Sequence, residues 1–408
     1  MTASPSTTAS PAAAPRQPLP DTLAQHVRKL ATDPAFPTGL PSPFYTDDTL
    51  LAHERDTVLG SGWTALAFGA DVPKAGDVYP VDLARLPLLL LRDRGNNLKV
   101  FHNVCRHRGM KLVNQAGNAG RVIKCPYHAW CYSLDGALSA TPHVGGPGVH
   151  ETDGFEPSEF GLMPVRSGVW HDTVFINLDG KAPPLEDALA ALRVRWAAFE
   201  GAQVVTEEGF GFSFELDTNW KLPIENYLEA YHLPTIHPAL NAFSKLEDHY
   251  NIEGPGGIGG QGSTVCRPPM DDDGRRLPTL EGLPDDWMEK AEYVAVFPNV
   301  MFGIHRDHFY SVIATPVAPG KTLERARIYC FSEAGLSEDL KPLRQRTAEV
   351  WRSIFAEDVI AVEGMQAGRY STAFDGGALT PVMDTPTRHF HTWMAQALLD
   401  NPGTSPTR

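Results

Sequence analysis

The spacing of hydrophobic positions predicts one helix near the start of the chain and a β-rich region after it. Residues 21–31 repeat apolar side chains every three or four positions, which is typical of a helix. From 63 to 175, short apolar runs alternate with Gly, Pro and Asn, which predicts strands joined by tight turns. The run 88–91 should pair with 99–101 across a Gly-Asn-Asn turn, and Pro87 lies at its start, where no ladder N–H is needed.

The second half of the chain combines further strands with longer helices. Apolar spacing predicts a helix over 184–199 and another over 341–366, which a tail follows. Six glycines within 254–262 predict a mobile loop, which is either a plain surface linker or a lid. The strands expected here are 169–177, 210–216, 293–297, 309–314 and 326–331.

The composition is that of an ordinary globular protein, with 42% hydrophobic and 21% charged residues in 408, enough for two domains. A net charge of −14 argues against nucleic acid and anionic membranes as partners. The most aliphatic run, 86–91, is too short to span a bilayer. Residues 1–20 are rich in Ser, Thr, Ala and Pro, which predicts a disordered tail and no secretory signal. We therefore expect a cytoplasmic protein.

Two short motifs in the β-rich region alternate cysteine with histidine. Cys105 and His107 form the first pair, and Cys125 and His128 form the second. A structural zinc site is the simpler alternative, but zinc fingers group their cysteines in one half and their histidines in the other. The interleaved order instead favours a Rieske [2Fe–2S] cluster, in which two cysteines hold one iron and two histidines the other. The three remaining cysteines are expected to be reduced core residues.

A second group of metal-binding side chains lies about a hundred residues later. On a helix, Glu225, Glu229 and His232 would share one face. His237 would be rotated off that face, but Pro234 can kink or unwind the helix and bring it back. Two imidazoles with one carboxylate predict a mononuclear iron site whose open faces bind dioxygen.

Together the two motifs resemble those of the catalytic alpha subunits of Rieske non-haem iron oxygenases. The resemblance covers residues 43–366, including Asn219-Trp220-Lys221 and the Glu225-Asn226 pair before the histidines. In the second cluster motif, Ala129 stands where the family usually has glycine. It implies an α+β chain with an all-β Rieske domain and a larger antiparallel-sheet catalytic domain of the helix-grip type. The boundaries that we expect are a tail 1–20, a helical segment 21–59 packing on the catalytic domain, the Rieske domain 60–170, the catalytic domain 171–400 and a tail 401–408.

The resemblance also implies roles for three acidic residues. Asp358 matches the third iron ligand, and the neighbouring Glu357 is the alternative. Glu229 matches an acid that links the iron to a Rieske histidine of the neighbouring subunit in a homotrimer. Most family members have aspartate at this position. With glutamate there, the sequence resembles the carnitine- and betaine-oxidising branch of the family.

The family implies that a flavin or iron–sulfur reductase, or a ferredoxin, brings electrons from NAD(P)H for a reaction with O2. The first substrate hypothesis is a small quaternary ammonium compound such as a betaine, carnitine or choline, which is hydroxylated or N-demethylated. The second is an aromatic compound, hydroxylated or cis-dihydroxylated. The third, from another class, is a Rieske electron carrier with a vestigial second site. Aromatic residues that could form a cation cage are Tyr227, Phe302, Phe309, Tyr310, Phe390 and Trp393.

Overall fold

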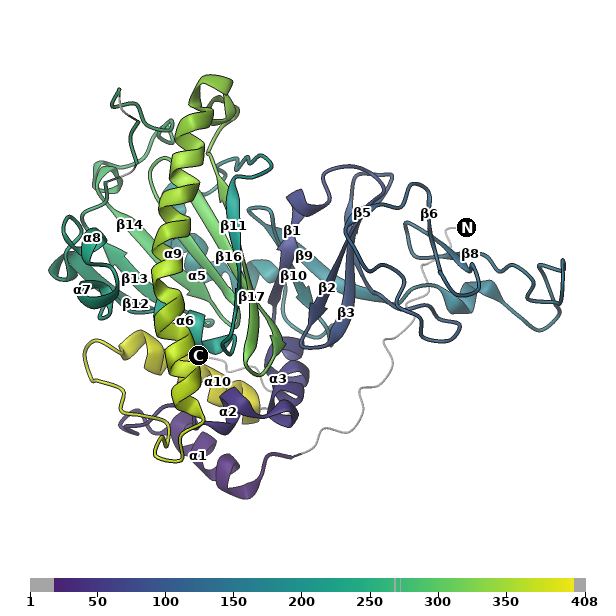
Figure 1. The fold of residues 1–408 in the computed structure, drawn as a ribbon, viewed down its shortest axis with the longest axis horizontal. Helices are drawn as coiled ribbons and strands as arrows, with labels where there is room; N and C mark the ends of the chain where they lie inside the picture. The colour runs from purple at the N-terminus through teal and green to yellow at the C-terminus, as the bar shows by residue number, and fades with distance from the viewer. Residues whose placement is uncertain (1–17, 268, 272, 400–408) are drawn as a thin grey trace.

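Two sheet-based halves lie side by side in the computed structural model, which describes residues 18–267, 269–271 and 273–399 (Figure 1). The expected tail 401–408, and all but the last three residues of the tail 1–20, lie outside these residues. One half holds a seven-stranded sheet of order β1-β10-β9-β4-β3-β2-β5 and a small sheet of order β6-β7-β8. The other half holds a seven-stranded antiparallel sheet of order β11-β17-β16-β15-β14-β13-β12. Together with its helices this is the α+β class that the sequence predicts.

The first half is built from short strands and turns, as expected. The hairpin forms as predicted, since β3 pairs antiparallel with β4 and places Leu90 opposite Val100. Pro87 is the second residue of β3. The strands are β1 (Thr64–Phe68), β2 (Asp77–Leu83), β3 (Leu86–Arg92), β4 (Leu98–His102), β5 (Gly117–Asn118), β6 (Val122–Lys124), β7 (Cys131–Ser133), β8 (Leu138–Ala140), β9 (Pro164–Trp170) and β10 (Thr173–Asn177).

The single strand expected over 169–177 is wrong. His171 and Asp172 adopt positive φ angles of 43° and 69°, and the chain reverses there to form the β9–β10 hairpin. The polar pair His171-Asp172 between the two apolar runs is the local sign of this turn. The expected domain boundary at 170 would also divide this hairpin, and the sheet continues to Asn177.

The second half places the antiparallel sheet beneath the long helix α9 (Figure 1). The strands expected over 210–216, 293–297, 309–314 and 326–331 and the helix expected over 341–366 are all present. Its strands are β11 (Gly211–Leu216), β12 (His249–Gly254), β13 (Ile258–Ser263), β14 (Ala291–Val296), β15 (Val300–Ile304), β16 (Phe309–Ala318) and β17 (Lys321–Tyr329). Its main helices are α6 (Lys221–Tyr227), α7 (Leu233–Ile236), α8 (Pro238–Asn241), α9 (Lys341–Arg369) and α10 (Thr385–Leu399).

Two expectations about helices need correction. The helix expected over 184–199 is broken into α4 (Leu185–Ala188), α5 (Ala190–Arg195) and a 3₁₀ turn, although its apolar residues Leu185, Leu189, Leu192 and Trp196 are all buried in one cluster. The tail expected after residue 366 instead contains α10, whose Phe390 is fully buried against Phe297.

The glycine-rich segment is also not a mobile loop. Residues 258–263 form β13, a buried strand between β12 and β14, and only 255–257 form the connecting turn. A Cβ at Gly260 would lie 2.0 Å from the backbone oxygen of Tyr293, and one at Gly262 would lie 2.2 Å from the Tyr250 ring. The glycines therefore allow neighbouring groups to approach closely.

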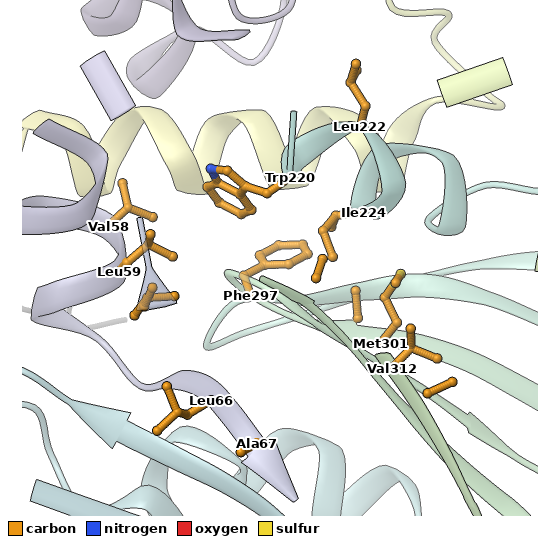
Figure 2. Packing of buried hydrophobic residues seen from close by; sticks show 14 of the residues in the cluster. Val58, Leu59, Leu66, Ala67, Trp220, Leu222, Ile224, Phe297, Met301 and Val312 are labelled. Atoms are coloured by element: carbon orange, nitrogen blue, oxygen red, sulfur yellow. The ribbon is translucent and has the colours of Figure 1, made fainter. Parts of the chain in front are cut away.

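The N-terminal helices α1 (Asp21–Thr32), α2 (Pro43–Thr46) and α3 (Asp48–Ser61) pack on the second half of the molecule. Figure 2 shows Val58 and Leu59 of α3 facing Trp220 of the α6 lead-in, with Phe297 beside them. A buried ion pair joins the same elements, because Lys221 Nζ lies 2.7 Å from Glu54 Oε1 and both side chains are fully buried. No helix in the described ranges is long and apolar enough to cross a membrane.

Replacing Lys221 with Met should destabilise the fold strongly. The variant keeps the apolar stem but leaves the Glu54 carboxylate buried without a cation, which costs about 3–5 kcal/mol of unfolding free energy. Urea titration of the purified protein measures this loss. The matched control is Arg85→Ala, which breaks an exposed pair with Asp48 and should cost about 1 kcal/mol or less. Equal losses in the two variants would contradict a structural role for the buried pair.

Candidate metal centres

The two cysteine–histidine motifs form a matched pair of turns. In the first, the Gly109 N–H donates to the Cys105 carbonyl at 3.1 Å. In the second, the Ala129 N–H donates to the Cys125 carbonyl, also at 3.1 Å. Each turn closes through a residue with positive φ, 74° at Gly109 and 58° at Ala129. A glycine would adopt this conformation without strain, so Ala129 costs about 1–2 kcal/mol and explains why the family uses glycine there.

The turns bring all four candidate cluster residues together. The rings of His107 and His128 have centroids 4.7 Å apart, and His107 stacks on Trp130 at 4.6 Å. Cys105 and Cys125 are both buried. The hydroxyl of Tyr132 lies 3.3 Å from Cys105 Sγ and accepts the Arg106 N–H, which orders the first turn.

This donor set suits an iron–sulfur cluster. Burial raises the pKa of the Cys105 thiol, and the neighbouring Cys125 adds to the effect, so two thiolates here need a cationic partner. The buried Nδ1 of His128 has no hydrogen-bond partner among the described residues, which leaves a lone pair free for a metal. Two sulfurs and two imidazoles in one pocket are the donors of a Rieske cluster.

The second centre forms where a helix ends early. The continuous helix that would place Glu225, Glu229 and His232 on one face is not present, because α6 ends at Tyr227. His232 and His237 instead flank the single turn of α7, whose second residue is Pro234. Unwinding thus brings both histidines together, as the proline suggested, and their ring centroids are 5.1 Å apart.

Asp358 of α9 meets both imidazoles. Its Oδ1 lies 3.0 Å from His237 Nε2 and 3.6 Å from His232 Nε2. One ligand atom from each of the three residues lies within 4.8 Å of the others, a spacing that suits a single metal ion. Burial opposes a charge on His237, but the carboxylates of Asp358 and Glu357 outweigh it and raise the pKa of the imidazole.

Two further carboxylates contact the Nδ1 atoms of the histidines, on the side of each ring away from Asp358. Glu229 accepts from His232 Nδ1 at 2.8 Å, and Glu357 accepts from His237 Nδ1 at 2.7 Å. With a metal ion bound between the three residues, each imidazole would keep its proton on Nδ1 and present its Nε2 lone pair to the ion. This arrangement gives Glu357 a role of its own, as the support of a candidate ligand.

Glu225 does not belong to this site. Its carboxylate accepts from Tyr45 at 2.6 Å and lies 3.0 Å from His391 Nε2 and 3.6 Å from Arg369. Glu225 therefore joins α2, α6, α9 and α10 and has a structural role. The next residue, Asn226, does line the cavity beside the candidate metal ligands.

A cavity opens on the three candidate iron ligands. Tyr227 and Tyr310 line it as expected, but Phe302 and Phe309 pack against Trp170 elsewhere. The expected residues Phe390 and Trp393 pack on Phe297. Sequence reasoning missed the other aromatic walls, Tyr293, Trp351 and Phe355, and the polar residues Ser244, His249 and Gln261. Helical spacing could have indicated Phe355 and Trp351, which lie one and two turns before Asp358 on α9.

The two candidate centres lie on opposite sides of the folded molecule (Figure 1). In Figure 1 the small sheet β6–β8, which flanks the second cysteine motif, lies far from α7 and α8. The two seven-stranded sheets lie between them.

Comparison with known proteins agrees with both halves. Residues 62–152 match the Rieske [2Fe-2S] domain, and residues 202–400 match the catalytic domain of the ring hydroxylating alpha subunit. The oxygenase subunit of carnitine monooxygenase from Escherichia coli K12 is 27% identical over 374 residues, covering 88% of this chain and 94% of that protein. Chloroplastic choline monooxygenase from Beta vulgaris is 27% identical over 369 residues, covering 88% and 76%.

A solved structure has the same fold. The quaternary ammonium Rieske monooxygenase CntA, in complex with L-carnitine, superposes with a TM-score of 0.70 at 24% identity, covering 93% of this chain and 99% of that one. The two matched domains together carry a Rieske cluster and a mononuclear iron that works with dioxygen. The chain is therefore an oxygenase subunit of the Rieske non-haem iron oxygenase family.

Proposed function

We propose that this subunit oxidises a small quaternary ammonium compound in the cavity above His232, His237 and Asp358. These three residues would hold the mononuclear iron, and Cys105, His107, Cys125 and His128 would hold the cluster. The observation that carries the proposal is the convergence of a two-histidine, one-carboxylate set on a cavity with aromatic walls. When bound, the cluster supplies single electrons and the iron supplies activation of dioxygen.

The protein's own groups prepare this site. Glu229 and Glu357 keep the Nδ1 protons in place, so that both Nε2 lone pairs stay available. Tyr310 is buried, and Tyr227 and Tyr293 are half-buried around the cavity; removal from water raises the pKa values of all three well above the ordinary range. They therefore remain neutral phenols whose ring faces can contact a ligand.

The charges around the cavity favour a cationic substrate. Neither Lys nor Arg occurs among the described residues that line it, whereas Asp358 does, and Glu324 lines a narrow extension beside it. Burial, with a contribution from Asp358, raises the pKa of Glu324 to about 8, so Glu324 is mostly protonated at neutral pH and adds little negative charge. Aromatic faces are the usual receptor for a trimethylammonium group, and the tyrosines and Trp351 of the cavity offer such faces.

The relatives support this substrate class, since their names record carnitine and choline as substrates. Hydroxylation of an aromatic compound is the second candidate, because the rings that line the cavity would also accept a flat apolar ligand. The polar residues Asn226, Ser244, His249 and Gln261 on the same cavity fit a small polar substrate better. An electron carrier with a vestigial second site is disfavoured by the complete ligand set.

Glu229 would connect centres in different subunits. It contacts a candidate iron ligand but no cluster residue of its own chain, and its side chain is 13% exposed. A Rieske domain from a neighbouring subunit could therefore approach it, as in a homotrimer of the family type. A flavin or iron–sulfur reductase, or a ferredoxin, would supply the electrons from NAD(P)H.

Oxygen consumption tests the substrate. With a generic reductase and NADH, choline, carnitine or glycine betaine should stimulate oxygen uptake and give an oxidised product that carries label from ¹⁸O₂. Aromatic acids should give neither. Labelled product from an aromatic acid, with none from any quaternary amine, would reverse the order of the two candidates.

Replacing Asp358 and Glu357 one at a time should distinguish an iron ligand from the support of a ligand. Asp358→Ala should lose about one iron per chain and keep the Rieske spectrum, because only two imidazoles remain. Glu357→Ala should keep the site but weaken its iron affinity by about 10- to 100-fold, because His237 loses its support. Iron titration of both variants distinguishes them. If Glu357→Ala loses the iron at saturating metal while Asp358→Ala retains it, the ligand assignment is wrong.

Glu229→Gln should load both centres and accept electrons at the cluster, yet turn over about 10- to 100-fold more slowly. A neutral amide is a weaker acceptor for the His232 N–H than a carboxylate. Cluster reduction and turnover are measured separately by stopped flow.

Mixing this variant with the cluster-dead His107→Ala chain tests the route between subunits. Mixed oligomers would pair an intact cluster with an intact Glu229 on the neighbour, so activity should partly return. A mixture shown to exchange subunits that stays inactive would exclude transfer between chains.

A further inference from the structure

A buried hydrogen-bonded chain lies directly behind the aromatic wall of the cavity. Asp307 and His308 follow β15 and are almost completely buried. His308 Nδ1 lies 2.7 Å from Asp307 Oδ1, and its Nε2 lies 2.8 Å from Nε1 of Trp351 on α9. None of the proposed metal ligands belongs to this chain, although Trp351 lines the cavity.

The direction of both hydrogen bonds follows from the indole. An indole nitrogen can only donate, so His308 Nε2 must accept the Trp351 N–H. The imidazole proton then lies on Nδ1 and is donated to the Asp307 carboxylate. The chain therefore runs from the indole through a neutral imidazole to a buried negative charge.

The same contacts hold the indole within the wall. Its ring centroid lies 4.7 Å from that of Tyr310 and 6.0 Å from that of Tyr293, and both tyrosines line the cavity. Trp351 is two helical turns before Asp358 on α9, on the same side of the helix. Fixing the indole thus fixes an aromatic surface close to the candidate iron ligands.

We propose that Asp307 and His308 are positioning residues that hold Trp351 as the cation-binding wall and strengthen its attraction for a quaternary ammonium group. The inference rests on the proposed function and deepens it. Hydrogen bonds in series polarise one another, so the carboxylate shifts electron density through the imidazole toward the indole. A more electron-rich indole face attracts a cation more strongly, whereas a neutral ligand gains nothing.

The test compares choline with its neutral isostere, 3,3-dimethylbutan-1-ol, by calorimetry on the metal-loaded protein without oxygen. Asp307→Asn keeps an acceptor for the His308 N–H but removes the charge. It should weaken choline binding by roughly 2- to 30-fold, the range of a cation–π contact, and change binding of the isostere by less than about twofold. Equal weakening of both ligands would show a merely structural role and overturn the inference.

A second variant distinguishes an effect of the Asp307 charge that is relayed through the indole from a direct effect of the charge on the ligand. In Trp351→Phe, which has no N–H for His308, Asp307→Asn should no longer change the preference for choline. If the effect persists there, the carboxylate acts directly through space and the relay is overturned. If Asp307→Asn does not fold, His308→Gln replaces it, because its amide accepts the indole N–H without the link to Asp307 and should show the same loss.

Asp172→Asn is the matched control. Asp172 is a half-buried aspartate that accepts a hydrogen bond from the Tyr329 hydroxyl at 3.0 Å. Neither residue lines the cavity, so replacing Asp172 should leave the preference unchanged. Binding of choline and its isostere to the wild-type protein distinguishes failure of the proposed cationic substrate from failure of this inference alone. If it binds choline no better than the isostere, the proposed cationic substrate fails together with the inference. If it prefers choline and Asp307→Asn keeps the full preference, only the inference fails.

Discussion

The packing of α9 on the antiparallel sheet is the constraint on which the catalytic half depends. It carries Asp358 to two histidines that lie 121 and 126 positions earlier in the sequence, and no local feature of the chain would do so. Trp351, Phe355 and Val362 form the buried side of this helix. Burial of each such large apolar side chain contributes about 1.5–3 kcal/mol, which holds the helix in place.

Polar contacts then fix the register of α9 against the histidine segment. Gln366 accepts the Asn219 N–H at 3.0 Å, and the Thr218 hydroxyl donates to the Val362 carbonyl at 2.9 Å. The next two residues, Trp220 and Lys221, both donate to Glu54 of α3. The Asn-Trp-Lys motif therefore ties α9, α6 and the N-terminal helices together, which explains its presence just before the metal-binding segment.

Sequence patterns identified the parts of the site that depend on local chemistry. The interleaved cysteines and histidines, the proline between His232 and His237 and the two adjacent acids were all visible in short segments. The structure brings each group together, and it assigns the Glu357 and Asp358 side chains to different nitrogens of His237. The sequence indicated Tyr227 and Tyr310 in the wall of the cavity but not Tyr293 and Trp351, because these come from a strand and a helix that meet only in the folded chain. Likewise, the glycines of β13 indicated flexibility, whereas the close approach of neighbouring groups is what requires them.

The central claim is that one chain carries an electron-transfer centre and a separate catalytic centre. Iron and acid-labile sulfide per chain, measured on anaerobically reconstituted protein, test it most directly. The account predicts about three irons with about two sulfides, two irons in the cluster and one on the histidine–aspartate site. About two irons with two sulfides, in protein saturated with ferrous iron, would contradict it and leave only an electron carrier.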